Sequence, residues 1–122
     1  MKGIFEFEVN GIKRGFKFGT YALAIAQERD GCELSTLFQR IGYGKMEGRN
    51  VNVMSLLNIF YGAAVHYAES KRQEIDFSAS DVSDWLDEMG LEKTNNMLAS
   101  GLETFTPKNS NSLPEEREKI LV

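Results

Sequence analysis

The dipeptide Asn10-Gly11 constrains the fold of this chain more than any other feature of its sequence. It joins two runs of alternating apolar and polar residues, 3–9 and 12–18, and Asn-Gly is the preferred two-residue connection of a type I′ β-hairpin. Such a turn fixes the strand register, so Phe7 is predicted to face Arg14, and Phe5 to face Phe16. One face of the hairpin then carries Phe5, Phe7, Val9, Ile12, Phe16 and Phe18, and the other carries Glu6, Glu8, Lys13 and Lys17.

An isolated hairpin of this kind is only marginally stable in water. We therefore expect its aromatic face to pack on the rest of the chain and its charged face to contact solvent. Opposed charges such as Glu8 and Lys13 reinforce the predicted register.

Helical patterns follow the hairpin. Thr20 is predicted to cap a helix over residues 21–30, and Gly31 to end it, because glycine readily adopts the left-handed conformation found after helices. Apolar residues spaced by three and four positions predict a short amphipathic helix over residues 34–41.

The longest predicted helix covers residues 52–71. Its apolar residues form a wide stripe, which indicates the central helix of the domain. The stripe comprises Val53, Leu56, Leu57, Phe60, Tyr61, Ala64 and Ala68.

Two more helices are predicted towards the end of the chain. Ser78 and Asp81 have the spacing of a capping box, which begins a helix that ends at Gly90. Another helix is expected over residues 91–105. Trp85 is interpreted as a core anchor.

These elements predict an α+β fold that is mainly α, with an N-terminal two-stranded β-hairpin packed on a bundle of four to five helices. The length of 122 residues fits one domain. We assign residues 1–105 to that domain and the polar residues 106–122 to a flexible C-terminal tail.

The formal net charge of −4 argues against nucleic acid and against anionic membrane surfaces as partners. Cys32 is the single cysteine, which predicts a reducing compartment. The sequence shows no signal peptide and no membrane span, so a cytoplasmic location is expected.

No catalytic, cofactor or metal site is predicted. His66 is the only histidine, and with Glu69 it would supply just half of a metal site. A Walker motif ending at Lys45 would need glycine where Gln39 stands and serine or threonine where Met46 stands.

Aromatic and methionine side chains are candidates for partner contact, although most such residues simply build the core. Acidic residues on one helix are interpreted as a solvated face, with an electrostatic contact to a basic partner as the alternative. The candidate partner-binding residues are Tyr43, Met46, Tyr61, Tyr67, Asp84 and Glu88.

The order of these elements resembles a known family. The features that carry the resemblance are the hairpin runs 5–11 and 16–20, the helix over 34–41, the aromatic helix segment 56–64 and the acidic segment 78–87. Over residues 4–102 the chain is similar to the tail assembly chaperones of long-tailed bacteriophages and prophages.

The resemblance implies a non-catalytic chaperone in the cytoplasm of the bacterial host. Its partner would be the tape measure protein, with the tail tube protein as a further partner, and it would be absent from the mature virion. The exposed hairpin edges permit self-association.

Three alternatives remain open. A head–tail connector or tail completion protein would have a similar size and charge. A small enzyme is the least supported. A DNA-binding regulator would need a helix-turn-helix that reads DNA with Glu33, Ser35, Thr36, Gln39 and Arg40, of which one is basic.

Overall fold

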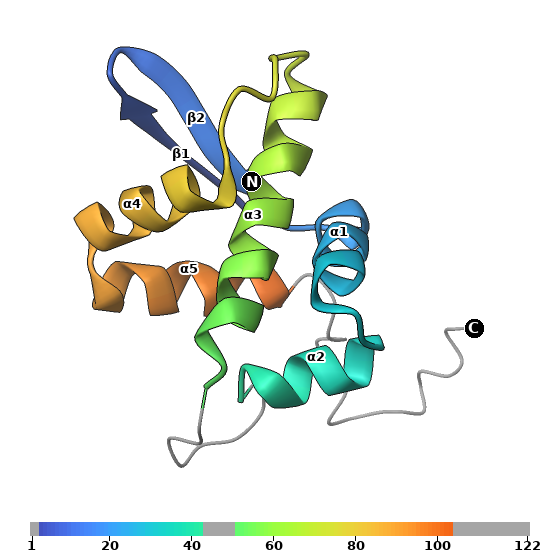
Figure 1. Ribbon diagram of the computed structural model, residues 1–122. Helices are drawn as coiled ribbons and strands as arrows, with labels where there is room; N and C mark the ends of the chain where they lie inside the picture. The colour runs from blue at the N-terminus through green and yellow to red at the C-terminus, as the bar shows by residue number, and fades with distance from the viewer. Residues whose placement is uncertain (1–2, 43–50, 104–122) are drawn as a thin grey trace, which may run out of the picture.

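The structure is a computed structural model that describes residues 3–42 and 51–103. These parts of the chain form a two-stranded hairpin and five helices, arranged as in Figure 1, which confirms the predicted α+β, mainly α class. The elements are β1 (Ile4–Val9), β2 (Ile12–Lys17), α1 (Thr20–Asp30), α2 (Leu34–Arg40), α3 (Val53–Ser70), α4 (Ala79–Met89) and α5 (Leu91–Leu102). The predicted tail, 106–122, lies outside the described residues.

The hairpin has the predicted register. β1 and β2 are antiparallel, with Phe5 opposite Phe16 and Phe7 opposite Arg14. Asn10 and Gly11 have φ angles of 51° and 82°, as both central residues of a type I′ turn require. The local turn chemistry therefore determines which side chains share a face.

The aromatic face of the hairpin packs on the helices, as predicted. The Phe16 ring lies 5.0 Å from the Phe60 ring of α3, and the Phe7 ring lies 5.6 Å from the Trp85 ring of α4. Phe16 and Phe60 are fully buried, and Trp85 belongs to the core as predicted. Ile12, at the hairpin turn, is exposed instead.

The opposite face of the hairpin is not wholly in contact with solvent, contrary to the prediction. Gly15 is buried there because the Tyr67 ring of α3 covers it. A Cβ atom at Gly15 would lie 2.6 Å from two carbons of that ring. The missing side chain of Gly15 thus makes room for an aromatic ring on the charged face.

α3 is the central helix. It crosses the middle of the molecule, with α1 on one side and α4 and α5 on the other (Figure 1). Gly62 of α3 faces the backbone carbonyl of Ala22 in α1, so closely that no side chain fits between them. Small residues therefore allow α1 and α3 to approach each other.

Helix ends follow the sequence signals with two exceptions, one of which is the last helix, predicted over residues 91–105, because α5 ends at Leu102. Gly31 has the predicted left-handed conformation, with φ of 69°, and Ser78 forms the predicted capping box with Asp81. The prediction for Thr20 is wrong, because Gly19 is the cap residue and Thr20 is the first residue of α1.

A buried carboxylate joins α1, α2 and α3. The Asp30 side chain is 4% exposed and accepts hydrogen bonds from Arg40 (2.6 Å), Asn58 (2.7 Å) and Ser55 (2.9 Å). Burial alone would raise the pKa of Asp30, but these hydrogen bonds outweigh burial and lower it. Asp30 is therefore a charged link between three helices.

Candidate functional site

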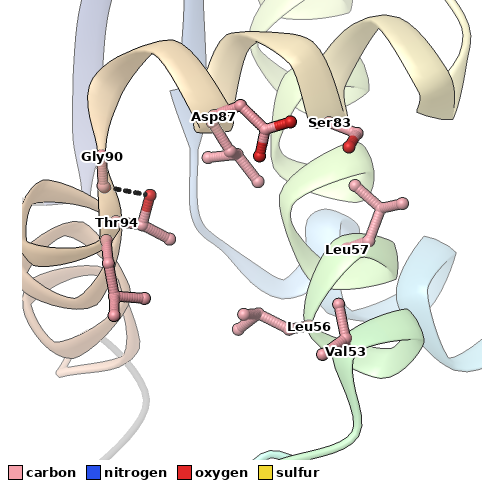
Figure 2. Close-up of a pocket in the computed structure, with 9 residues that line it drawn as sticks. Val53, Leu56, Leu57, Ser83, Asp87, Gly90 and Thr94 are labelled. Carbon is pink, nitrogen blue, oxygen red and sulfur yellow. Dashed lines mark hydrogen bonds between the residues drawn. The ribbon is translucent and has the colours of Figure 1, made fainter.

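An apolar groove opens between α3, α4 and α5, as Figure 2 shows. Its volume is about 320 Å³. Val53, Leu56 and Leu57 of α3 line one side, and Ser83, Leu86 and Asp87 of α4 line another. Gly90, Leu91 and Thr94 complete it where α4 turns into α5.

The groove exists because α4 and α5 are joined directly at Gly90. This glycine has φ of 97° and ψ of 161°, a backbone conformation that other residues rarely adopt, and it is both the C-cap of α4 and the N-cap of α5. The reversal leaves a space between the first turns of α3 and the junction of the two later helices.

The polar groups of the groove are few and lie at its edge. The Thr94 hydroxyl donates a 2.8 Å hydrogen bond to the Gly90 carbonyl, so it is already satisfied (Figure 2). Asp87 and Ser83 lie on the α4 side of the groove. The groove thus offers an apolar floor and one carboxylate at its border, without a convergent set of catalytic groups.

Two apolar side chains of the groove are unusually exposed. Val53 is 72% exposed and Leu91 is 75% exposed. Val51 and Met54, neighbours of Val53 in sequence, are exposed as well. The described ranges contain eight exposed large apolar residues. Four of them lie here: three within residues 51–54, and Leu91.

Val53 corrects the prediction that it belongs to the buried stripe of the central helix. The stripe pattern is right for Leu56, Leu57 and Phe60, which lie deeper in α3. At Val53, in the first turn, no described element covers the side chain. The helical periodicity indicates a face, but it does not say how far along the helix the covering elements reach.

Tyr67 does not fit its predicted role as a partner contact. It is 2% exposed, and its hydroxyl donates a 2.8 Å hydrogen bond to Glu6. Burial, followed by this hydrogen bond, raises the pKa of Tyr67 to about 12. The same hydrogen bond is the main cause that lowers the pKa of Glu6 below its ordinary value.

Tyr61 is half-buried. The guanidinium of Arg29 lies 4.3 Å from the centre of its ring, and the Phe77 ring lies 5.9 Å away. These neighbours cover part of the ring, and the predicted partner contact of Tyr61 stays a prediction.

Asp84 and Glu88 are exposed on α4. Glu88 lies beside a second, smaller cavity of about 110 Å³, on the side of α4 that faces the hairpin. The structure therefore does not bring all the predicted contact residues together. Tyr43 and Met46 lie outside the described residues.

The candidate chemical groups have structural partners. Burial is the main cause that lowers the pKa of His66, and its Nδ1 donates to the Lys17 carbonyl over 3.1 Å. Burial and the nearby Asp30 raise the pKa of the Cys32 thiol, which disfavours the nucleophilic thiolate. In the ranges 3–42 and 51–103, no group of three or more His, Cys, Asp or Glu residues could hold a metal ion.

No helix within the described part of the chain has the length and apolar character that crossing a bilayer requires. Comparisons of the chain with protein-family models, curated proteins and solved structures find no match.

Proposed function

We propose that this chain is a non-catalytic tail assembly chaperone of a bacteriophage or prophage that binds the tape measure protein. The single observation that supports the proposal most is the apolar groove between α3, α4 and α5, with Val53 and Leu91 exposed at its border. A chaperone that keeps an aggregation-prone partner in solution needs accessible apolar surface of this kind.

The groove suits a helical partner. Three helices form its walls, and it is lined mainly by leucine and valine side chains. An amphipathic helix binds such a groove through apolar residues spaced three or four positions apart. Tape measure proteins, as the resemblance implies, present long hydrophobic helices before the tail tube polymerises around them.

The charges beside the groove favour a basic flank on that helix. Asp87 lies at the groove, and Asp84 is exposed on the same helix. A partner helix that places lysine or arginine next to its apolar stripe would gain these contacts without burying an unpaired charge.

One observation weakens the DNA-binding alternative. Arg40, the one basic residue of the helix-turn-helix reading, forms a 2.6 Å ion pair with the buried Asp30. A phosphate contact by this guanidinium would compete with that ion pair.

Co-expression tests the proposal. The full chain is produced with the tape measure protein encoded by the same phage or prophage, and the soluble fraction of that protein is compared with expression alone. We expect a large rise in the soluble fraction and no copy of this chain in purified particles. Equal aggregation in both cultures would contradict chaperone activity, and stoichiometric presence in particles would favour the head–tail connector.

A further inference from the structure

The two edges of the hairpin differ in their backbone partners. On the outer edge of β2, the Lys13 carbonyl accepts a 3.0 Å hydrogen bond from Gln73, and the Lys17 carbonyl accepts one from His66. Tyr67 covers Gly15 between them. Side chains of α3 and of the segment that follows it therefore cover this edge, and Figure 1 shows β2 on the α3 side of the hairpin.

No element in the part of the chain that the structure describes covers the outer edge of β1 in this way. The Phe18 amide donates to the Gly3 carbonyl over 2.7 Å, so Gly3 and every second residue after it bond to β2. Ile4, Glu6 and Glu8 consequently direct their backbone N–H and C=O groups away from β2. Within residues 3–42 and 51–103, these backbone groups have no hydrogen-bond partner.

A small cavity lies beside this open edge. It has a volume of about 110 Å³, and its apolar lining comes from Phe7 and Val9 of β1 and from Trp85 and Met89 of α4. The remaining lining residues, Glu8 and Glu88, are acidic and exposed. The open edge thus combines unpaired backbone groups, an apolar cavity and carboxylates.

We propose that β1 is a docking edge for an extended segment of another protein, which adds to the hairpin as a third strand. The segment would carry basic side chains at alternate positions, next to Glu6 and Glu8. Its intervening apolar side chains would enter the cavity beside Trp85 and Met89. Backbone hydrogen bonds supply affinity in this mode of binding, and the alternating side chains supply specificity.

Charge disfavours a second copy of β1 as the occupant. Antiparallel pairing of two copies about Glu6 would place the two Glu6 residues opposite each other, and like charges in directly opposed positions are destabilising. A basic extended segment instead finds complementary charge in Glu8 and Glu88, which form no ion pair with a described residue, whereas Glu6 already lies 3.7 Å from the Lys13 ammonium. This surface lies on the hairpin side of α4, whereas the apolar groove lies on its other side.

Amide hydrogen exchange measured by NMR tests the proposal directly. The probe is a capped hexapeptide that alternates lysine and valine, and the control peptide has an N-methyl group on every backbone amide, which removes all the donors that strand pairing needs. We expect the first peptide to slow exchange at the Ile4, Glu6 and Glu8 amides of the full chain and to bind less tightly as salt is added. The control peptide should leave these amides unchanged.

Two variants separate the backbone contact from the charge contact. Glu8→Pro removes an outward N–H and leaves the bonds between β1 and β2 intact, as proline on an edge strand allows. We expect it to weaken peptide binding roughly tenfold or more, because the ring also blocks close approach of a strand. The double variant Glu8→Gln/Glu88→Gln keeps every backbone group and should weaken binding about threefold.

Glu28→Gln, on the exposed surface of α1, is the matched control for loss of a carboxylate and should bind the peptide like the wild type. The proposal is overturned if about 1 mM peptide leaves the β1 amides unprotected, or if Glu8→Pro and the double variant both bind like the wild type. It is also overturned if the Glu6 and Glu8 amides are already protected without peptide, since the edge is then occupied by another copy or by another part of this chain.

Discussion

The Tyr67 hydroxyl in α3 donates a 2.8 Å hydrogen bond to the Glu6 carboxylate in β1, and the Tyr67 ring lies over Gly15 of β2. One side chain of the central helix thus contacts both strands of the hairpin. This contact therefore fixes the position of β1, the strand with the open edge.

Tyr67→Phe tests the contribution of that hydroxyl. The variant keeps the ring over Gly15 and loses the hydrogen bond, so we expect the free energy of unfolding to fall by about 1 kcal/mol. Tyr21→Phe is the matched control, since the Tyr21 hydroxyl also donates to a carboxylate, that of Glu69, but on the exposed surface. Urea denaturation followed by circular dichroism measures the free energy of unfolding of both variants. Equal stability of Tyr67→Phe and the wild type would show that the hydrogen bond does not stabilise the fold.

Gly15→Ala tests the close approach of the ring. The added Cβ would lie 2.6 Å from the Tyr67 ring and 2.9 Å from the Phe5 carbonyl oxygen, so strands or ring must move. We expect a loss of about 1–3 kcal/mol in the free energy of unfolding. The same substitution in a Tyr67→Ala background is the control, because the two closest atoms to the added Cβ belong to the Tyr67 ring and its removal should reduce the cost. A neutral Gly15→Ala variant would contradict the described packing.

Asp30 makes stability depend on pH in the acid range. Its pKa in the folded chain is lowered, so the unfolded chain binds a proton more readily than the folded chain. The contribution is therefore fully present above the unfolded pKa of about 3.9 and is lost as the pH falls through the lower, folded value. Thermal denaturation measured from neutral pH down through the acid range follows this loss.

Asp30→Ala should destabilise the chain by about 2–4 kcal/mol at neutral pH, because Asn58, Ser55 and Arg40 lose their buried acceptor. Its stability should also fall less steeply with acid than that of the wild type. Asp84→Ala removes an exposed carboxylate and is the control. An acid dependence unchanged by Asp30→Ala would contradict the charged link between the helices.

Local sequence signals predicted the elements well. The register follows from Asn10-Gly11, and the start of α4 follows from Ser78 and Asp81, because both depend on a few neighbouring residues. Contacts between residues far apart in the sequence could not be predicted in this way. Nothing in the sequence around Tyr67 indicates that Gly15, on a distant strand, leaves a space for its ring.

The groove was missed for a related reason. Val53 continues the apolar stripe of α3, and a stripe is the usual sign of burial. Whether a neighbouring helix covers the first turn depends on the path of the chain through Gly90 and on the position of Leu91, which helical periodicity does not encode. The exposure of Val53, an apolar residue in the regular stripe of α3, could therefore be seen only in the structure.

The proposed binding of a tape measure helix in the apolar groove is tested most directly by the affinity of that complex. Isothermal titration of the full chain with an amphipathic helical segment of that protein compares the wild type with Val53→Asp/Leu91→Asp. Both side chains are highly exposed, so the double variant should keep the wild-type fold and melting temperature.

We expect the double variant to bind at least about tenfold more weakly, since two apolar contacts are replaced by charges that must be desolvated. Ile75→Asp, at an exposed apolar residue outside the groove, should bind like the wild type. Equal affinities of the wild type and the folded double variant would contradict the assignment of the groove as the tape measure site.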